Sequence, residues 1–121
     1  MTTLNLFRHT TDVESYAAGQ VIFEKGQPGD VLYVVREGQV SIVLNGAEID
    51  SAGPGGIIGE MALIDDQPRS ATAIATTNCT LVPIDERRFT FLVQQTPHFA
   101  LTVMRVMAAR LRRRMGVDAA D

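Results

Sequence analysis

The sequence predicts a mainly β fold with C-terminal helices: a double-stranded β-helix, or jelly-roll-like β-roll, with one short inserted helix and two α-helices after it. A length of 121 residues suits one domain. Residues 13–85 are rich in glycine and β-branched residues, with turn signals every six to ten positions. After Pro83 the apolar spacing changes from every second residue to the helical period. We therefore expect one domain over residues 1–121, with the β-roll at about 12–84 and the helices at about 85–115.

Turn sequences divide the first part of the chain into strands. The strongest of them is Asn45-Gly46, because both central residues of a type I′ hairpin need a positive φ. Gly38 and the segment 26–30 mark other reversals. The expected strands are Asp12–Ala17, Val21–Glu24, Val31–Glu37, Gln39–Leu44, Ala47–Asp50, Ser70–Ala75 and Cys79–Ile84.

Two helices are expected after the last strand. Asp85 is a suitable N-cap for the first helix, which ends near Gln95. The second helix is expected over 97–115, because Thr96 can cap it and proline is tolerated at the first helical position. Gly116 offers a C-terminal stop, after which the remaining residues are expected to fray.

The second helix is apolar over much of its circumference, so it is expected to bury two sides. One side can cover the β-roll, and the other can pair with a second copy of the chain as an a/d seam does. A possible homodimer through the helix 97–115 follows, the alternative being a helix wholly buried against its own roll. The apolar positions are Ala100, Met104, Met107, Leu111 and Met115, widened by Phe99, Val103 and Val106.

Composition excludes several classes of protein. A net charge of −3 argues against a general nucleic-acid binder. No apolar run approaches the roughly 18 residues of a membrane span, and residues 1–9 lack the apolar core of a signal peptide. The single cysteine, Cys79, allows no internal disulfide and is expected in the core. We expect a cytoplasmic protein without membrane contact.

The segment 53–72 between the fifth and sixth strands has the composition of an anion-binding loop. Its glycines let the backbone approach a ligand closely. Residues Glu60–Ile64 are long enough for one helical turn, whose first N–H groups lack intrahelical partners and attract a phosphate. Arg69 adds a planar guanidinium, Ser70 a hydroxyl and Ala71 a backbone N–H.

Glu60 does not fit a site for phosphate alone, because a carboxylate repels an anion. It fits if it accepts a hydrogen bond from a hydroxyl group, for which a ribose 2′-OH is the natural donor. A ligand with one phosphate and an adjacent ribose hydroxyl, such as a cyclic ribonucleotide, meets both conditions. The alternative is a surface salt bridge between Glu60 and Arg69 that closes the loop.

Two stretches of this segment also resemble a known family. Residues 59–63, Gly-Glu-Met-Ala-Leu, followed by residues 68–72, Pro-Arg-Ser-Ala-Thr, resemble the phosphate-binding cassette of cyclic-nucleotide-binding domains. That family includes bacterial catabolite activators, regulatory subunits of protein kinase A and cyclic-nucleotide-gated channels. Residues 18–23, 29–33 and 37–40 resemble the family's strand and turn signatures in the same order, so the resemblance extends over about 13–111.

The resemblance implies a role for each matching residue. Glu60 would bind the ribose 2′-OH, Arg69 and Ser70 the cyclic phosphate, and the backbone of Gly59, Glu60, Met61 and Ala62 the remaining oxygens. With the N–H of Ala71, these residues form the expected ligand site. The family often caps the base from the final helix. Where bacterial activators have a Thr-Ser pair this chain has Arg114-Met115, so Arg110 or Arg114 is the candidate base cap.

The expected ligand is cAMP, with cGMP as the alternative because Ser70 can also reach the guanine amino group. No helix-turn-helix follows the last helix, so we expect no direct DNA binding and an unknown effector protein that reads a movement of that helix.

Two other classes compete with this interpretation. A metal-dependent cupin-like enzyme would need clustered histidines, yet the only two, His9 and His98, fall outside the strands. We therefore expect no catalytic residues, no metal and no cofactor other than the nucleotide ligand. The third class is a ligand-free β-roll that serves only as an interaction or dimerisation module.

Overall fold

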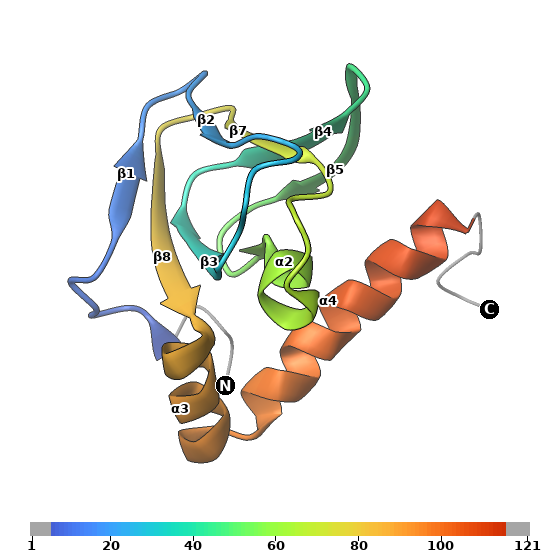
Figure 1. The fold of residues 1–121 in the computed structure, drawn as a ribbon. Helices are drawn as coiled ribbons and strands as arrows, with labels where there is room; N and C mark the ends of the chain where they lie inside the picture. Colours follow the sequence, from blue (N-terminus) through green and yellow to red (C-terminus); the bar gives the residue numbers. More distant parts are fainter. Residues whose placement is uncertain (1–5, 116–121) are drawn as a thin grey trace.

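The structure is a computed structural model that describes residues 6–115, so the predicted stop at Gly116 and the frayed tail lie outside the described residues. Two four-stranded antiparallel sheets, ordered β1-β8-β3-β6 and β2-β7-β4-β5, form a roll (Figure 1). The predicted mainly β fold with C-terminal helices is confirmed. The strands are β1 Glu14–Tyr16, β2 Val21–Phe23, β3 Val31–Glu37, β4 Val40–Leu44, β5 Ala47–Ala52, β6 Ile57–Ile58, β7 Thr72–Ala75 and β8 Cys79–Asp85.

All seven predicted strands form, with two differences that affect the site. β7 begins at Thr72, so the prediction that Ser70 and Ala71 belong to the strand is wrong, and both lie in the loop before it. β6 was not predicted, because a two-residue strand is too short to show a period. It pairs with β3, with Ile57 opposite Val34, and leads directly into the following helix.

The hairpin between β4 and β5 has the predicted turn, since Asn45 and Gly46 have φ values of 53° and 81°. Beyond the turn the two strands change register. Val43 lies opposite Glu48 and Ile42 opposite Asp50, so Ile49 is an extra residue in β5. This irregularity is a β-bulge, which bends a strand and redirects its side chains.

The strand β3 has two buried faces, which explains its continuous apolar sequence. Tyr33 and Val35 point into the core between the sheets, and Leu32 and Val34 point into a second core on the opposite face. The second core also contains Phe99 and Val103 of α4. One helix face is therefore anchored on the outside of a sheet.

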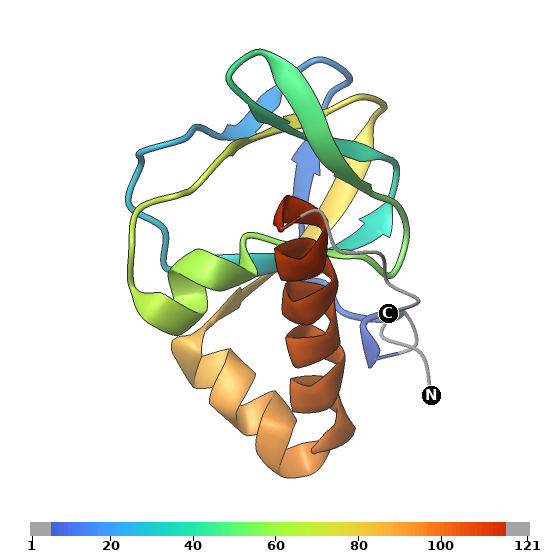
Figure 2. The same ribbon diagram turned by 90° about the vertical axis from the view of Figure 1, so that its right-hand side faces the viewer.

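Helices α2 Glu60–Asp65, α3 Glu86–Gln95 and α4 His98–Arg114 lie beneath the roll, and α4 runs past α2 (Figures 1 and 2). Asp85 caps α3 as predicted, accepting a hydrogen bond of 2.8 Å from the N–H of Arg88. The predicted side-chain cap by Thr96 is wrong. The N-terminus of α4 has no side-chain cap hydrogen bond, and the carbonyl of Thr96 accepts from the N–H of Phe99.

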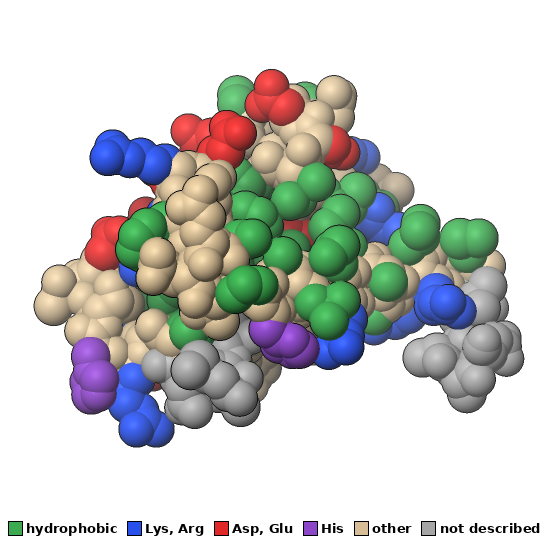
Figure 3. All heavy atoms as spheres, turned by 90° about the horizontal axis from the view of Figure 1, so that it is seen from below, with side chains coloured by type: hydrophobic (Ala, Val, Ile, Leu, Met, Phe, Trp, Pro, Cys, Tyr) green, Lys and Arg blue, Asp and Glu red, His purple; other side chains and the backbone are tan. Residues whose placement is uncertain are grey.

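The apolar stripe of α4 divides into two faces. Val106 and Met107 pack with the second core, whereas Met104, Leu111 and Met115 are exposed. The alternative of a helix wholly buried against its own roll is therefore wrong. Figure 3 shows hydrophobic side chains gathered over the middle of the underside of the molecule, with a smaller group at one end. Over residues 6–115 we find no helix with the length and apolarity that crossing a membrane requires.

Candidate ligand-binding site

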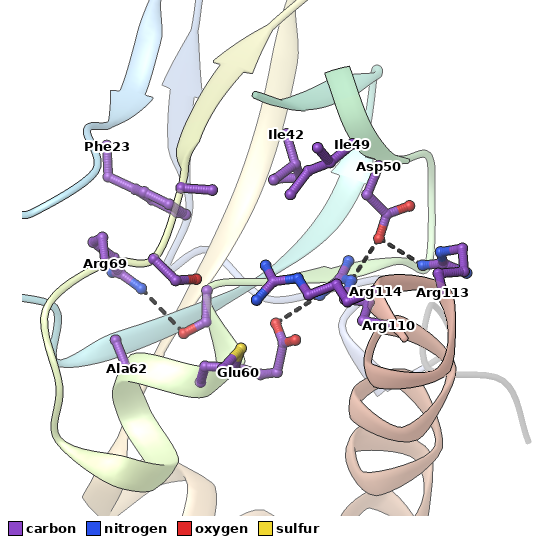
Figure 4. Close-up of a pocket in the computed structure, with 14 residues that line it drawn as sticks. Phe23, Ile42, Ile49, Asp50, Glu60, Ala62, Arg69, Arg110, Arg113 and Arg114 are labelled. Carbon is purple, nitrogen blue, oxygen red and sulfur yellow. Dashed lines mark hydrogen bonds and ion pairs between the residues drawn. The ribbon is translucent and has the colours of Figure 1, made fainter. Parts of the chain in front are cut away.

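A cavity of about 300 Å³ lies between the β4–β5 hairpin, the start of α2 and the last turns of α4 (Figure 4). Every residue of the expected ligand site lines it, together with both candidate base caps. These residues are Gly59, Glu60, Met61, Ala62, Arg69, Ser70, Ala71, Arg110 and Arg114. The fold thus brings together residues 59–71 and residues 110–114, which are far apart in the sequence.

The entry to α2 depends on glycine. Gly59 has a φ of 75°, in the left-handed region, and no side chain caps the helix that starts after it. A Cβ atom at Gly59 would lie 2.5 Å from Nη1 of Arg69, so a larger residue would displace the guanidinium. The absence of a side chain lets Arg69 approach the backbone at the start of α2.

Arg69 is buried, with 6% of its surface exposed. Nη1 donates a hydrogen bond of 3.0 Å to the carbonyl of Gly59, and the guanidinium lies 4.1 Å from the ring centroid of Phe23. No described residue forms an ion pair with Arg69, and its Nε has no hydrogen-bond partner in that part of the chain. Burial lowers the pKa of Arg69 below its ordinary value, so this cation is held at an energetic cost.

Glu60 pairs with α4 and not with Arg69. Its side chain is 3% exposed, and Oε2 accepts a hydrogen bond of 2.6 Å from Nη1 of Arg110. Across residues 6–115 no ion pair joins Glu60 to Arg69, so the alternative of a bridge between them is not observed. Arg110, one of the two candidate base caps, is instead engaged by the carboxylate that the sequence assigns to the ribose.

All three guanidinium nitrogens of Arg110 are engaged. Nε donates to Oδ2 of Asp50 at 2.7 Å, in addition to the bond from Nη1 to Glu60 (Figure 4). Nη2 donates to the carbonyl of Ile57 at 2.7 Å. Nη2 of Arg113 also donates to Oδ2 of Asp50, at 2.8 Å. Burial by itself would lower the pKa of Arg110, but the charges and hydrogen bonds of Glu60 and Asp50 raise it above its ordinary value.

Sequence reasoning missed five residues of the cavity wall: Phe23, Ile42, Ile49, Asp50 and Arg113. Neighbouring residues of a regular strand point to opposite faces, so period-two reasoning cannot place both Ile49 and Asp50 in one cavity. The bulge in β5 puts them there. Phe23 ends the observed strand β2, and its contact with the guanidinium of Arg69 marks it as part of the site.

The cavity suits an anion that also has an apolar part. Four arginines and two carboxylates line it, a formal excess of two positive charges. The side chains of Phe23, Ile42, Ile49 and Ala62 add apolar wall. In the described part of the chain no three His, Cys, Asp or Glu residues are grouped closely enough to hold a metal ion.

These features are those of a nucleotide-binding β-roll, and comparison with known proteins identifies its family. Residues 13–96 match the family model of the cyclic nucleotide-binding domain. The chain belongs to this family, which confirms the resemblance found in the sequence.

Relatives and solved structures agree with this assignment. The chain is 36% identical to the cAMP-dependent protein kinase regulatory subunit of Yarrowia lipolytica, over 67% of this chain and 22% of that protein. The Thermus thermophilus catabolite activator protein is 31% identical, with a TM-score of 0.76 over 92% of this chain and 55% of that one. A protein of a cyclic-GMP-dependent pathway that regulates bacterial phytopathogenesis is 29% identical, with a TM-score of 0.71 over 84% of each chain. The chain therefore spans about a fifth of the curated relative named here.

Proposed function

We propose that this chain is a sensor domain that binds cAMP in the cavity between the roll and α4 and catalyses no reaction. The observation that carries the proposal is the buried guanidinium of Arg69, which has no ion-pair partner within residues 6–115 although a carboxylate lines the same cavity. A cyclic phosphate would supply the missing negative charge. Ser70, the N–H of Ala71 and the backbone of residues 59–62 would hold the other phosphate oxygens.

Glu60 would accept the ribose 2′-OH. Arg110 occupies Oε2 of Glu60, which leaves Oε1 for the hydroxyl of the ligand. The purine would lie between the apolar wall of Ile42 and Ile49 and the arginines of α4, where Arg110 or Arg114 would contact its face. One cyclic nucleotide would in this way join α2, β5 and α4.

A second candidate ligand, cGMP, is favoured by a separate observation. Arg113 and Arg114 line the cavity from α4, and arginine donates readily to the O6 and N7 acceptors of guanine. Ser70 would be available to the guanine amino group. The relatives include proteins named for each nucleotide, so both ligands belong in the same assay.

Binding would act on the position of α4. Arg110 fastens this helix to α2 and β5, and a ligand in the cavity adds contacts only when the helix is in place. The nucleotide would stabilise that arrangement through its higher affinity for it. An effector protein, or a second copy of the chain, would detect the shift. The cytoplasmic location expected from the sequence stays a prediction.

Calorimetric titration with cAMP, cGMP and linear 5′-AMP tests the proposal. We expect saturable binding of cAMP, weaker binding of cGMP and much weaker binding of 5′-AMP, whose phosphate is not cyclised onto the 3′ oxygen of the ribose. A thermal-unfolding scan with each nucleotide checks the result, because a ligand that binds only the folded state raises the melting temperature. If cAMP and cGMP both give no heat of binding and no shift in melting temperature, the ligand-free interaction module is favoured instead.

A further inference from the structure

The residue Asp50 is connected to the proposed ribose contact through a single guanidinium. Arg110 bridges Asp50 on β5 and Glu60 at the start of α2, with hydrogen bonds of 2.7 and 2.6 Å. Both carboxylates are largely buried, with side-chain exposures of 18% and 3%. The two buried carboxylates share this guanidinium, which offsets the cost of burying their charges.

The backbone is shaped to bring Asp50 to this position. Ile49 is the extra residue of the bulge in β5, and both it and Asp50 line the cavity. A regular strand would turn one of them away. β5 lies at the edge of its sheet, so the bulge interrupts no second ladder.

We propose that Asp50 is a positioning residue for the ribose site: it holds Arg110 so that this arginine orients the Glu60 carboxylate toward the 2′-OH of the nucleotide. The inference rests on the proposed function of Glu60. The guanidinium is planar, so fixing Nε on Asp50 and Nη2 on the carbonyl of Ile57 also fixes the direction of Nη1. Glu60 is then held at Oε2, and Oε1 would be left to accept the 2′-OH of the ligand.

Without Asp50, Arg110 would keep the carbonyl of Ile57 and Glu60 but lose one of its two charged partners. The guanidinium, and with it the carboxylate of Glu60, would then be held less rigidly. Asp50 would therefore affect the part of the affinity that comes from the 2′-OH more than the part that comes from the phosphate. Arg113, which also donates to Asp50, is half exposed and would not replace it.

The test compares cAMP with 2′-deoxy-cAMP on the unmodified chain and on Asp50→Asn, by calorimetric titration. On the unmodified chain we expect removal of the 2′-OH to weaken binding on the order of 10- to 100-fold, as for a hydrogen bond to a charged group. In Asp50→Asn this ratio should fall at least about threefold, which is the coupling expected of groups in one network. A merely structural role would weaken both nucleotides equally and leave the ratio unchanged.

Asp12→Asn is the matched control. It also removes an Asp–Arg ion pair, between Asp12 and Arg88, but neither residue lines the cavity. It should keep the ratio of the unmodified chain. Asp50→Ser serves as a second variant, and thermal unfolding verifies that both variants fold. An unchanged ratio in folded Asp50 variants overturns the inference and leaves the proposed function intact. If neither nucleotide binds the unmodified chain, the proposed function itself fails.

Discussion

Arg69 and Glu60 are both buried in the wall of one cavity, but their charges have different surroundings. Glu60 is neutralised by Arg110, at 2.6 Å. Arg69 lies against an aromatic ring and a carbonyl, and no carboxylate among the described residues is within ion-pair distance of it. Arg69 loses much of its hydration when the chain folds, so the free energy of ligand binding does not have to include that cost. An arriving phosphate therefore meets a cation that is dehydrated and fixed in place, which is how a site gains affinity from preorganisation.

The substitution Arg69→Gln keeps a polar side chain but removes the charge. It should cost on the order of 2–4 kcal/mol of cyclic-nucleotide affinity, because a buried phosphate would lose its charged partner. Calorimetric titration measures the loss. Arg105→Gln, an exposed arginine of α4, is the matched control and should bind like the unmodified chain. Equal affinity in Arg69→Gln would refute the role of Arg69.

At the scale of elements, α4 has an inner face that packs on the roll and an outer face that is exposed. Phe99 and Val103 attach its inner face to the sheet. The outer face exposes Leu101, Met104, Leu111 and Met115, which with Ala108 follow steps of three and four along the helix. Leu101 and Ala108 take the place of Ala100 and Met107 in the predicted seam, because Met107 packs against the second core. This spacing is typical of a helix that pairs with another helix. Two heptads measure only about 20 Å, so we expect a weak homodimer.

Light scattering over a range of protein concentrations tests this pairing. The unmodified chain should change from monomer to dimer as concentration rises. Met104→Glu and Leu111→Glu should weaken the dimer on the order of tenfold or more, because each places a charge in the seam. Phe91→Glu changes an equally exposed apolar residue on α3 and should leave the dimer unaffected. A chain that stays monomeric at every concentration would rule out the seam.

At the scale of the whole molecule, a roll with a continuous apolar core is joined to its last helix partly by charges. Ile57, Phe99 and Val103 supply the apolar part of the junction. The remainder is the network of Arg110 and Arg113 with Glu60 and Asp50. Such a junction depends on the ionisation of its carboxylates, so the stability of the molecule is expected to depend on pH.

Asp50 provides the test of that dependence. Burial opposes its charge, but hydrogen bonds from Arg110 and from the N–H of Ser51, with the charges of both arginines, lower its pKa below the ordinary 3.8. A lowered pKa gives stability that is present above the unfolded value and is lost as pH falls through the folded value. The melting temperature of Asp50→Asn should lie below that of the unmodified chain at about pH 6, and the gap should narrow as the pH falls below the ordinary pKa of 3.8. A gap that does not change with pH would contradict this role.

Much of the fold could be predicted because its signals are local. Asn45-Gly46 defines a turn by the φ values it needs, and Asp85 defines a helix start by its side chain. For the opposite reason, β6 was not predicted and the side-chain cap predicted for α4 was wrong. A two-residue strand exists only because β3 offers it a partner, and α4 begins without a side-chain cap because packing of Phe99 holds its first turn.

The sequence by itself determined the type of fold, its family and the segment 59–72 that carries the anion-binding chemistry, because each depends on residues that are close together in the chain. Only the tertiary structure decided which charges meet. It joined Glu60 to Arg110 across 50 positions, brought Asp50 to the same guanidinium through a bulge, and left Arg69 without an ion-pair partner among the described residues. Partner choice among charges depends on distance in space, and spacing along the chain carries no record of that distance.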